Sequence, residues 1–171
     1  MFARIVAECL RGLHKVTRAL NLLGSFWIIV LLALTIANVI GRTLLDSPVP
    51  GAPDIGKLSL VMIVFLQLPH VFSQNRHIGA DFLSHTSLNR TLLIRIAVIP
   101  LVAGIVLFVL ISISSLPLAL SAVANNEFEY AGPFWVPVFP VRITIVMGSI
   151  LCVVELVLTL LKILPDVLVP R

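Results

Sequence analysis

Residues 21–40 read NLLGSFWIIVLLALTIANVI, a run of 20 residues with no acidic or basic side chain. A helix of about 20 apolar residues crosses a hydrocarbon layer of roughly 30 Å. Three further apolar runs follow at 55–72, 96–120 and 139–161. The sequence therefore predicts an all-α integral membrane protein, with four transmembrane helices in a single membrane domain over residues 1–171.

The composition leaves little material for a water-soluble domain. The 171-residue chain is 59% hydrophobic and 12% charged, whereas a soluble domain is about 25% charged. The net charge of +4 does not indicate a nucleic-acid partner, because the basic residues lie beside the apolar runs. Basic residues in such flanks are typical signals of membrane orientation.

The basic residues are divided unequally between the two sides of the predicted membrane. Nine of the 12 lie in the N-terminal segment, the middle loop and the C-terminal tail: Arg4, Arg11, Lys15, Arg18, Arg76, Arg90, Arg95, Lys162 and Arg171. The other three are Arg42, Lys57 and Arg142. Because loops rich in Lys and Arg stay in the cytoplasm, we expect both termini and the middle loop there.

Residues 1–20 have the pattern of an amphipathic helix. Charged residues recur every three or four positions on one face, at Arg4, Glu8, Arg11, Lys15 and Arg18, and apolar residues fill the other. This pattern favours an interfacial helix that lies along the cytoplasmic surface of the membrane. The alternative is an extension of the first span into water.

Glu155 is the only acidic residue well inside a predicted span. A buried carboxylate of this kind could carry a proton or a cation through the membrane. The competing interpretation is structural, since the carboxylate could instead pair with another helix or reach the headgroups at the nearer end of the span.

The outer ends of the helices offer two further candidates. Arg42 closes the first span and Asp54 opens the second, so an ion pair between them would fix how the two helices meet. The alternative is that both are solvated interfacial charges of little consequence. Trp135 belongs to an aromatic cluster with Tyr130 and Phe134, just before the fourth span, where interfacial aromatics are expected. The prolines around this cluster should keep the entry into the fourth span from being regular helix.

Three short motifs occur along the chain in a characteristic order. The first span ends in NVIGR, residues 38–42, the second leaves through RHIGAD, residues 76–81, and the fourth is entered through GPFWVP, residues 132–137. With Asp54 between the first two motifs, the chain resembles the small membrane subunit of tripartite ATP-independent periplasmic (TRAP) transporters. The resemblance covers nearly the whole chain, although Asp54 stands where the family more often has a glutamate.

The resemblance implies a role and several partners. The small subunit of this family is a scaffold for a large multispan subunit, which carries the sodium and substrate sites and moves like an elevator. A periplasmic binding protein delivers the substrate, typically an organic acid, at the bacterial inner membrane. The candidate structural or subunit-interface residues are Asn38, Arg42, Asp54, Arg76, Asp81, Trp135 and Glu155.

The acidic residues of the outer loops are candidates for contact with that binding protein. They are Asp46, Asp54, Glu127 and Glu129. We expect no cofactor in this chain, because no metal-ligand cluster or pair of facing histidines is apparent. Nor do we expect an enzyme, because no acid–base or nucleophile constellation converges. The main alternative is a self-sufficient four-helix transporter that works as an oligomer, with Glu155 as its essential carboxylate.

Overall fold

The computed structural model describes residues 2–74, 90–131 and 134–168. Four long helices make up nearly all of this: α1 (Phe2–Leu44), α2 (Ala52–Ser73), α4 (Arg90–Ala124) and α5 (Phe139–Leu168). Each is long and apolar enough to cross a membrane. The prediction of an all-α membrane protein with four spans is therefore confirmed. Two candidates, Arg76 and Asp81, lie outside the described residues, as does most of the middle loop.

Helix α1 is continuous from Phe2 to Leu44, so the amphipathic segment and the first span form one element. This continuity agrees with the second of the two interpretations above, an extension of the first span. At 1.5 Å per residue, the 43 residues of α1 are about 65 Å long. That is about twice the thickness of a hydrocarbon layer, so α1 continues well beyond it.

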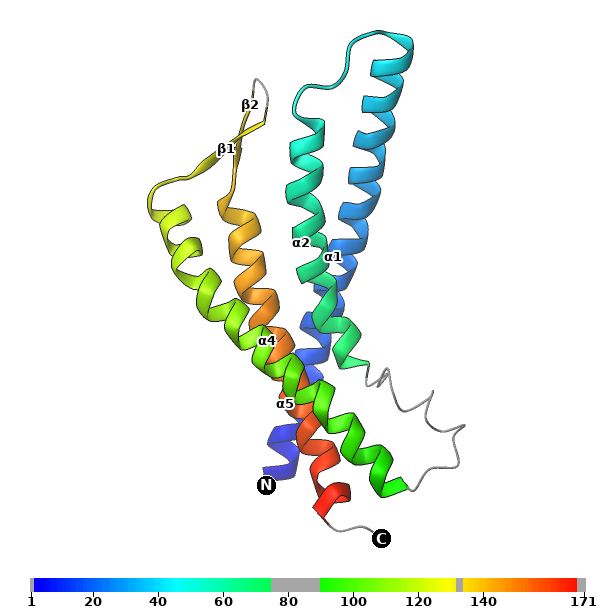
Figure 1. The fold of residues 1–171 in the computed structure, drawn as a ribbon, viewed down its shortest axis with the longest axis vertical. Helices are drawn as coiled ribbons and strands as arrows, with labels where there is room; N and C mark the ends of the chain where they lie inside the picture. Colours follow the sequence, from blue (N-terminus) through cyan, green and yellow to red (C-terminus); the bar gives the residue numbers. More distant parts are fainter. Residues whose placement is uncertain (1, 75–89, 132–133, 169–171) are drawn as a thin grey trace.

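The four helices pack in the order α1, α2, α5, α4 (Figure 1). Helix α2 contacts both α1 and α5, and α5 contacts α4. In both α1 and α4, only 6% of the most apolar stretch is buried. In α5, 44% of the corresponding stretch is buried. The first and third spans therefore present most of their apolar surface outward, while α5 forms the centre of the bundle.

The helices of the centre approach one another at small residues. Gly148 of α5 lies directly against the backbone of Phe65 in α2, and a Cβ atom at Gly148 would overlap the Phe65 carbonyl oxygen. Nearby, Ser112 of α4 donates a hydrogen bond of 2.8 Å to Ser149 of α5. Such contacts suit a membrane, because apolar side chains gain little by leaving lipid for protein, and association depends on close packing and hydrogen bonds.

A small hydrophobic core continues this packing toward the end of the bundle that holds the termini. Its buried members are Phe108, Cys152 and Leu156. Phe72 of α2 packs edge-on against Phe108 of α4, with ring centroids 5.7 Å apart. The core thus joins α2, α4 and α5 in one cluster.

The entry into the fourth span is a β-hairpin, which agrees with the expectation that this segment is not regular helix. The pairing of two strands was not predicted. Strand β1 (Phe128–Ala131) pairs in antiparallel fashion with β2 (Phe134–Pro137). Prolines are tolerated at strand ends and edges, and Pro137 is the last residue of β2, paired with Phe128. Aromatic and other residues alternate in FEYA, which is a strand signal, whereas FWVP shows no such alternation.

We predict that Gly148→Ala lowers the thermal stability of the protein. The new Cβ atom would overlap the Phe65 carbonyl and force α2 and α5 apart, and overpacking of this kind costs typically about 1–3 kcal/mol. Gly12→Ala is the matched control, because Gly12 has no atom within 4 Å of the added Cβ and alanine favours helix over glycine. Thermal unfolding in nanodiscs, followed by circular dichroism, should show a lower midpoint for Gly148→Ala alone. Equal midpoints for the two variants would contradict the close contact.

Candidate subunit interface

The NVIGR motif at the end of the first span forms the turn that returns the chain to α2. The Asn38 side-chain oxygen accepts a hydrogen bond of 3.0 Å from the Val49 amide. The Gly41 carbonyl accepts bonds from the amides of Leu45, at 3.2 Å, and Ser47, at 3.0 Å. A Cβ at Gly41 would lie 2.7 Å from the Ser47 carbonyl oxygen, so the loop can fold back only onto a glycine. Asn38 and Gly41 thus hold the reversal between α1 and α2.

The predicted ion pair between Arg42 and Asp54 is not formed. Among the residues that the structure describes, Arg42 takes part in no ion pair. Asp54 instead lies 3.9 Å from Lys57, one turn further along α2. Residues three apart are neighbours on a helix surface, so Lys57 can reach Asp54 without any contribution from α1.

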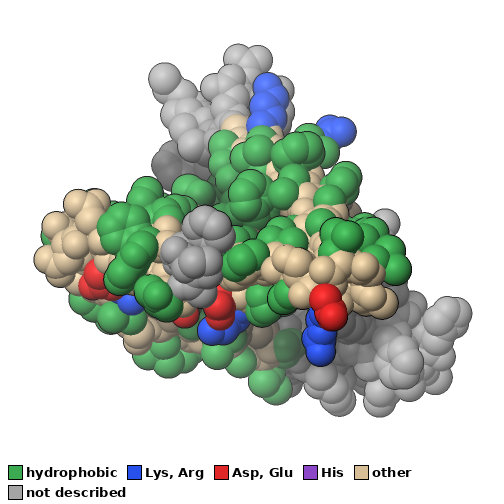
Figure 2. All heavy atoms as spheres, turned by 90° about the horizontal axis from the view of Figure 1, so that it is seen from above, with side chains coloured by type: hydrophobic (Ala, Val, Ile, Leu, Met, Phe, Trp, Pro, Cys, Tyr) green, Lys and Arg blue, Asp and Glu red, His purple; other side chains and the backbone are tan. Residues whose placement is uncertain are grey.

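Two ion pairs attach the hairpin region to the helices. Lys57 of α2 lies 3.7 Å from Glu129 in β1. Arg142 of α5 lies 2.6 Å from Glu127, just before β1, and also donates a hydrogen bond of 2.8 Å to the Leu118 carbonyl in α4. Figure 2 shows acidic and basic side chains side by side at this end of the molecule.

These pairs were missed by the sequence reasoning, although a signal was present. The sequence predicts that Glu127, Glu129, Lys57 and Arg142 lie on the same side of the membrane. Opposite charges on one surface favour ion pairs between them. The two glutamates therefore position the hairpin, and they are not free acidic groups on an open loop. Asp46 differs, since it is exposed and has no ion pair within the described ranges.

Trp135 lies on β2, directly across from Tyr130 of β1. The two rings meet edge to face, with centroids 5.2 Å apart and an interplanar angle of 87°. Both side chains remain largely exposed, at 66% for Trp135 and 65% for Tyr130. The aromatic cluster expected near the start of the fourth span is therefore present, on a strand pair that gives it a defined face.

Glu155 lies against α1 near the end of the bundle that holds both termini. Its side chain is only 3% exposed, and its Oε1 atom is 3.8 Å from Nδ1 of His14. The contact agrees with the structural interpretation, in which the carboxylate pairs with another helix. Because His14 belongs to the N-terminal part of α1, this contact also ties that part of α1 to α5.

Other polar side chains within the spans form hydrogen bonds inside the chain. The Gln67 amide of α2 bonds to Ser25 of α1 at 3.5 Å, and Ser112 bonds to Ser149. Thr144 donates to the Pro140 carbonyl one turn earlier in α5. The first two of these bonds join different helices, so these groups act in helix packing.

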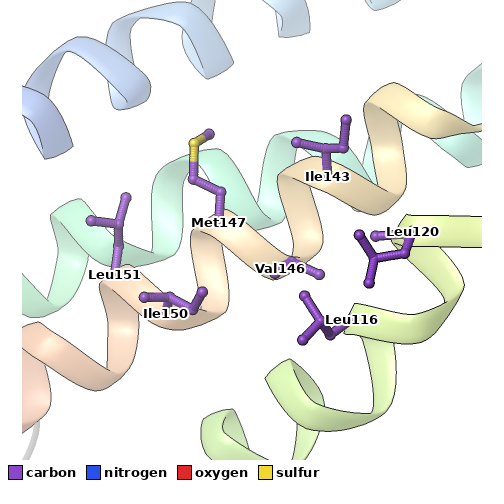
Figure 3. A pocket seen from close by; sticks show the side chains of 8 residues that line it. Leu116, Leu120, Ile143, Val146, Met147, Ile150 and Leu151 are labelled. Carbon is purple, nitrogen blue, oxygen red and sulfur yellow. The ribbon is translucent and has the colours of Figure 1, made fainter. Parts of the chain in front are cut away.

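An apolar groove of about 380 Å³ runs between α4 and α5. Figure 3 shows side chains of both helices lining it, among them Leu116, Leu120, Ile143 and Met147. No polar side chain lines the groove. In a membrane it suits an acyl chain or an apolar helix, and it offers no group that could bind an ion.

A second groove, of about 420 Å³, lies between the end of α1 and the start of α2. It is lined in part by Asn38 and Lys57, which already serve the loop and the ion pairs described above. The described residues thus form a bundle that ion pairs and hydrogen bonds hold together, with two outward apolar helices.

Comparison with known proteins identifies one similarity. The family model described as "Tripartite ATP-independent periplasmic transporters, DctQ component" matches residues 31–166. The match includes Asn38, Arg42, Asp54, Trp135 and Glu155, and leaves out the N-terminal part of α1. Neither a curated protein nor a solved structure matches the chain.

We predict that Asn38→Ala destabilises the protein by about 1–3 kcal/mol, because the half-buried Val49 amide loses its acceptor. Asn38→Asp is the matched control, since it keeps an oxygen in the same place. Chemical or thermal unfolding should rank the wild-type protein and Asn38→Asp above Asn38→Ala. If Asn38→Ala were as stable as the wild-type protein, the side chain would not hold the loop.

Proposed function

Because this chain belongs to the DctQ component family of tripartite ATP-independent periplasmic transporters, we propose that it is the fixed scaffold for a larger membrane subunit. The chain is a multi-pass membrane protein and a transporter component. The family match over residues 31–166 is the observation that carries the proposal. The scaffold role itself rests on the physical arguments that follow.

A scaffold must keep its shape while its partner moves. The contact of Gly148 with Phe65 and the hydrogen bond between Ser112 and Ser149 join α2, α4 and α5 without intervening lipid. The ion pairs of Glu127 and Glu129 add cross-links at the hairpin end. These contacts favour a rigid support over a mobile carrier.

The partner would dock on the apolar surfaces that the bundle leaves exposed. Helices α1 and α4 are the natural candidates, because they lie at the two ends of the row and bury least of their apolar surface. The large subunit would then carry the sodium and substrate sites and make the elevator movement. Within the described spans of this chain, polar side chains such as Gln67 and Ser112 are taken up in helix contacts, which supports that division of labour.

The proposed location is the bacterial inner membrane, with both termini in the cytoplasm. Both termini lie at the same end of the molecule (Figure 1), as an even number of spans requires. The positive-inside rule assigns that end to the cytoplasm, because nine of the 12 basic residues flank it. The hairpin and the loop after α1 would then face the periplasm, where a binding protein delivers an organic acid.

We predict that a large multispan subunit co-purifies with this chain in near-equal amount when its C-terminus is tagged and the native membrane is extracted gently. Mass spectrometry of the eluate would identify the second protein. The chain reconstituted alone into liposomes should take up no solute. Recovery of the chain alone, with solute uptake that Glu155→Gln abolishes, would overturn the scaffold role and establish the self-sufficient transporter.

We predict that Asp46→Asn slows uptake by the whole transporter without lowering the yield of the complex. Asp46 is exposed on the loop after α1 and has a positive φ of 49°, a conformation that asparagine also accepts. The substitution therefore removes charge and keeps the loop conformation. Since charges at an interface rim act mainly on association rate, the effect should be largest at limiting binding protein and low salt. Unchanged uptake under those conditions would remove Asp46 as a contact for the binding protein.

A further inference from the structure

The hairpin presents two chemically different faces. Successive residues of a strand point to opposite faces, and the register pairs Phe128 with Pro137 and Tyr130 with Trp135. These four side chains therefore share one face, which we call the aromatic face. Its three aromatic rings are 52–66% exposed. Glu129 points to the opposite face.

The ion pairs determine which way each face turns. Glu129 meets Lys57 of α2 at 3.7 Å, so the face opposite the aromatic one is directed toward α2. Glu127 and Arg142 hold the base of the hairpin to α5 at 2.6 Å. The aromatic face is consequently held away from α2.

The hairpin lies at the depth of a membrane surface. It connects the end of α4 at Ala124 to the start of α5 at Phe139, and apolar side chains just inside these points, such as Leu120 and Ile143, are exposed. In Figure 1 the strands rise beside the upper parts of α1 and α2 and do not extend past the end of α1. Arg42, close to that end, marks the limit of the first apolar run.

Two opposing requirements narrow this depth further. A two-stranded hairpin has open edges, and unpaired backbone N–H and C=O groups are not tolerated in the hydrocarbon layer. The exposed rings of Phe128, Tyr130 and Trp135, in contrast, disfavour full exposure to water. The hydrated headgroup layer satisfies both requirements, and Tyr and Trp are enriched at that level.

We propose that the aromatic face of the hairpin binds the lipid headgroup layer at its end of the bundle and thereby fixes the depth of α4 and α5. The lipid surface is the occupant because the hairpin directly joins the ends of α4 and α5, where exposed side chains such as Leu120 and Ile143 are also apolar. The proposal goes beyond the scaffold role and does not depend on which partner the chain binds.

Tryptophan fluorescence tests this proposal directly, because the chain contains only two tryptophans, Trp27 and Trp135. Trp27→Phe leaves Trp135 as the single reporter. The full chain, with its co-purifying subunits, would be reconstituted into phosphatidylcholine nanodiscs. Lipids brominated close to the headgroup or close to the chain end would serve as depth-dependent quenchers, and iodide as the aqueous quencher.

The expected result is a blue-shifted Trp135 emission with a larger loss of intensity from shallow bromine than from deep bromine, and little loss from iodide. Trp135→Phe is the matched control, because it leaves Trp27, nine residues along α1 from Arg18 and so about 13 Å deeper. Trp27 should be quenched more by deep bromine. The same order in the chain without its subunits would show that lipid alone supplies the contact.

Two outcomes would overturn the proposal. Strong iodide quenching without bromine quenching would make the aromatic face a water-exposed surface, open to a soluble partner. Protection from both quenchers, lost when the other subunits are removed, would make it a protein interface. Neither outcome bears on co-purification, so the scaffold role stands or falls separately.

A second variant tests the part played by the ion pair. Glu129→Gln removes the partner of Lys57 on the hairpin, and Trp135 should then lose intensity more readily to iodide. Asp54→Asn is its control, because Asp54 is the other neighbour of Lys57 but lies on α2 and not on the hairpin. Equal iodide quenching in both variants would show that the Lys57–Glu129 pair does not orient the aromatic face.

Discussion

The contact of Gly148 with the backbone of Phe65 is the one on which the rest of the bundle depends. A membrane supplies no hydrophobic force to press apolar helices together, because lipid solvates leucine as well as another helix does. Helices therefore associate where small residues permit close approach. With α5 seated on α2 at this point, Ser149 comes within hydrogen-bond distance of Ser112, and α4 is joined to the same centre.

Several polar side chains lie inside the bundle and many apolar side chains outside it, and this distribution bears on function. Polar groups inside it, including Gln67 and Ser149, form hydrogen bonds with neighbouring helices, and Glu155 meets His14 near the end that holds the termini. The outer surfaces of α1 and α4 remain apolar and open. This division supports the proposed scaffold role.

Much of the fold was predictable because the span signal is local and strong. Each of the four predicted runs lies within a helix of the structure, and the transporter family was identified from short motifs such as NVIGR. The candidate sites were less predictable. Arg42 and Asp54 are close in the sequence but do not pair, whereas Glu129 finds Lys57 over a separation of 72 residues. The hairpin was not predicted, because the prolines indicated only the absence of regular helix and each strand has just four residues, with alternation in FEYA alone.

The sequence by itself determined that the chain is a four-span membrane protein, because the length and apolarity of a span follow directly from the thickness of the bilayer. It also determined the charge asymmetry between the two ends. Only the tertiary structure decided the order α1, α2, α5, α4, the pairing of Glu155 with His14 and the direction of the aromatic face. The physical reason is that these depend on contacts between residues far apart in the chain, and in lipid many helix faces are similarly apolar. A single glycine or ion pair then selects the arrangement, and its partner can be recognised only in space.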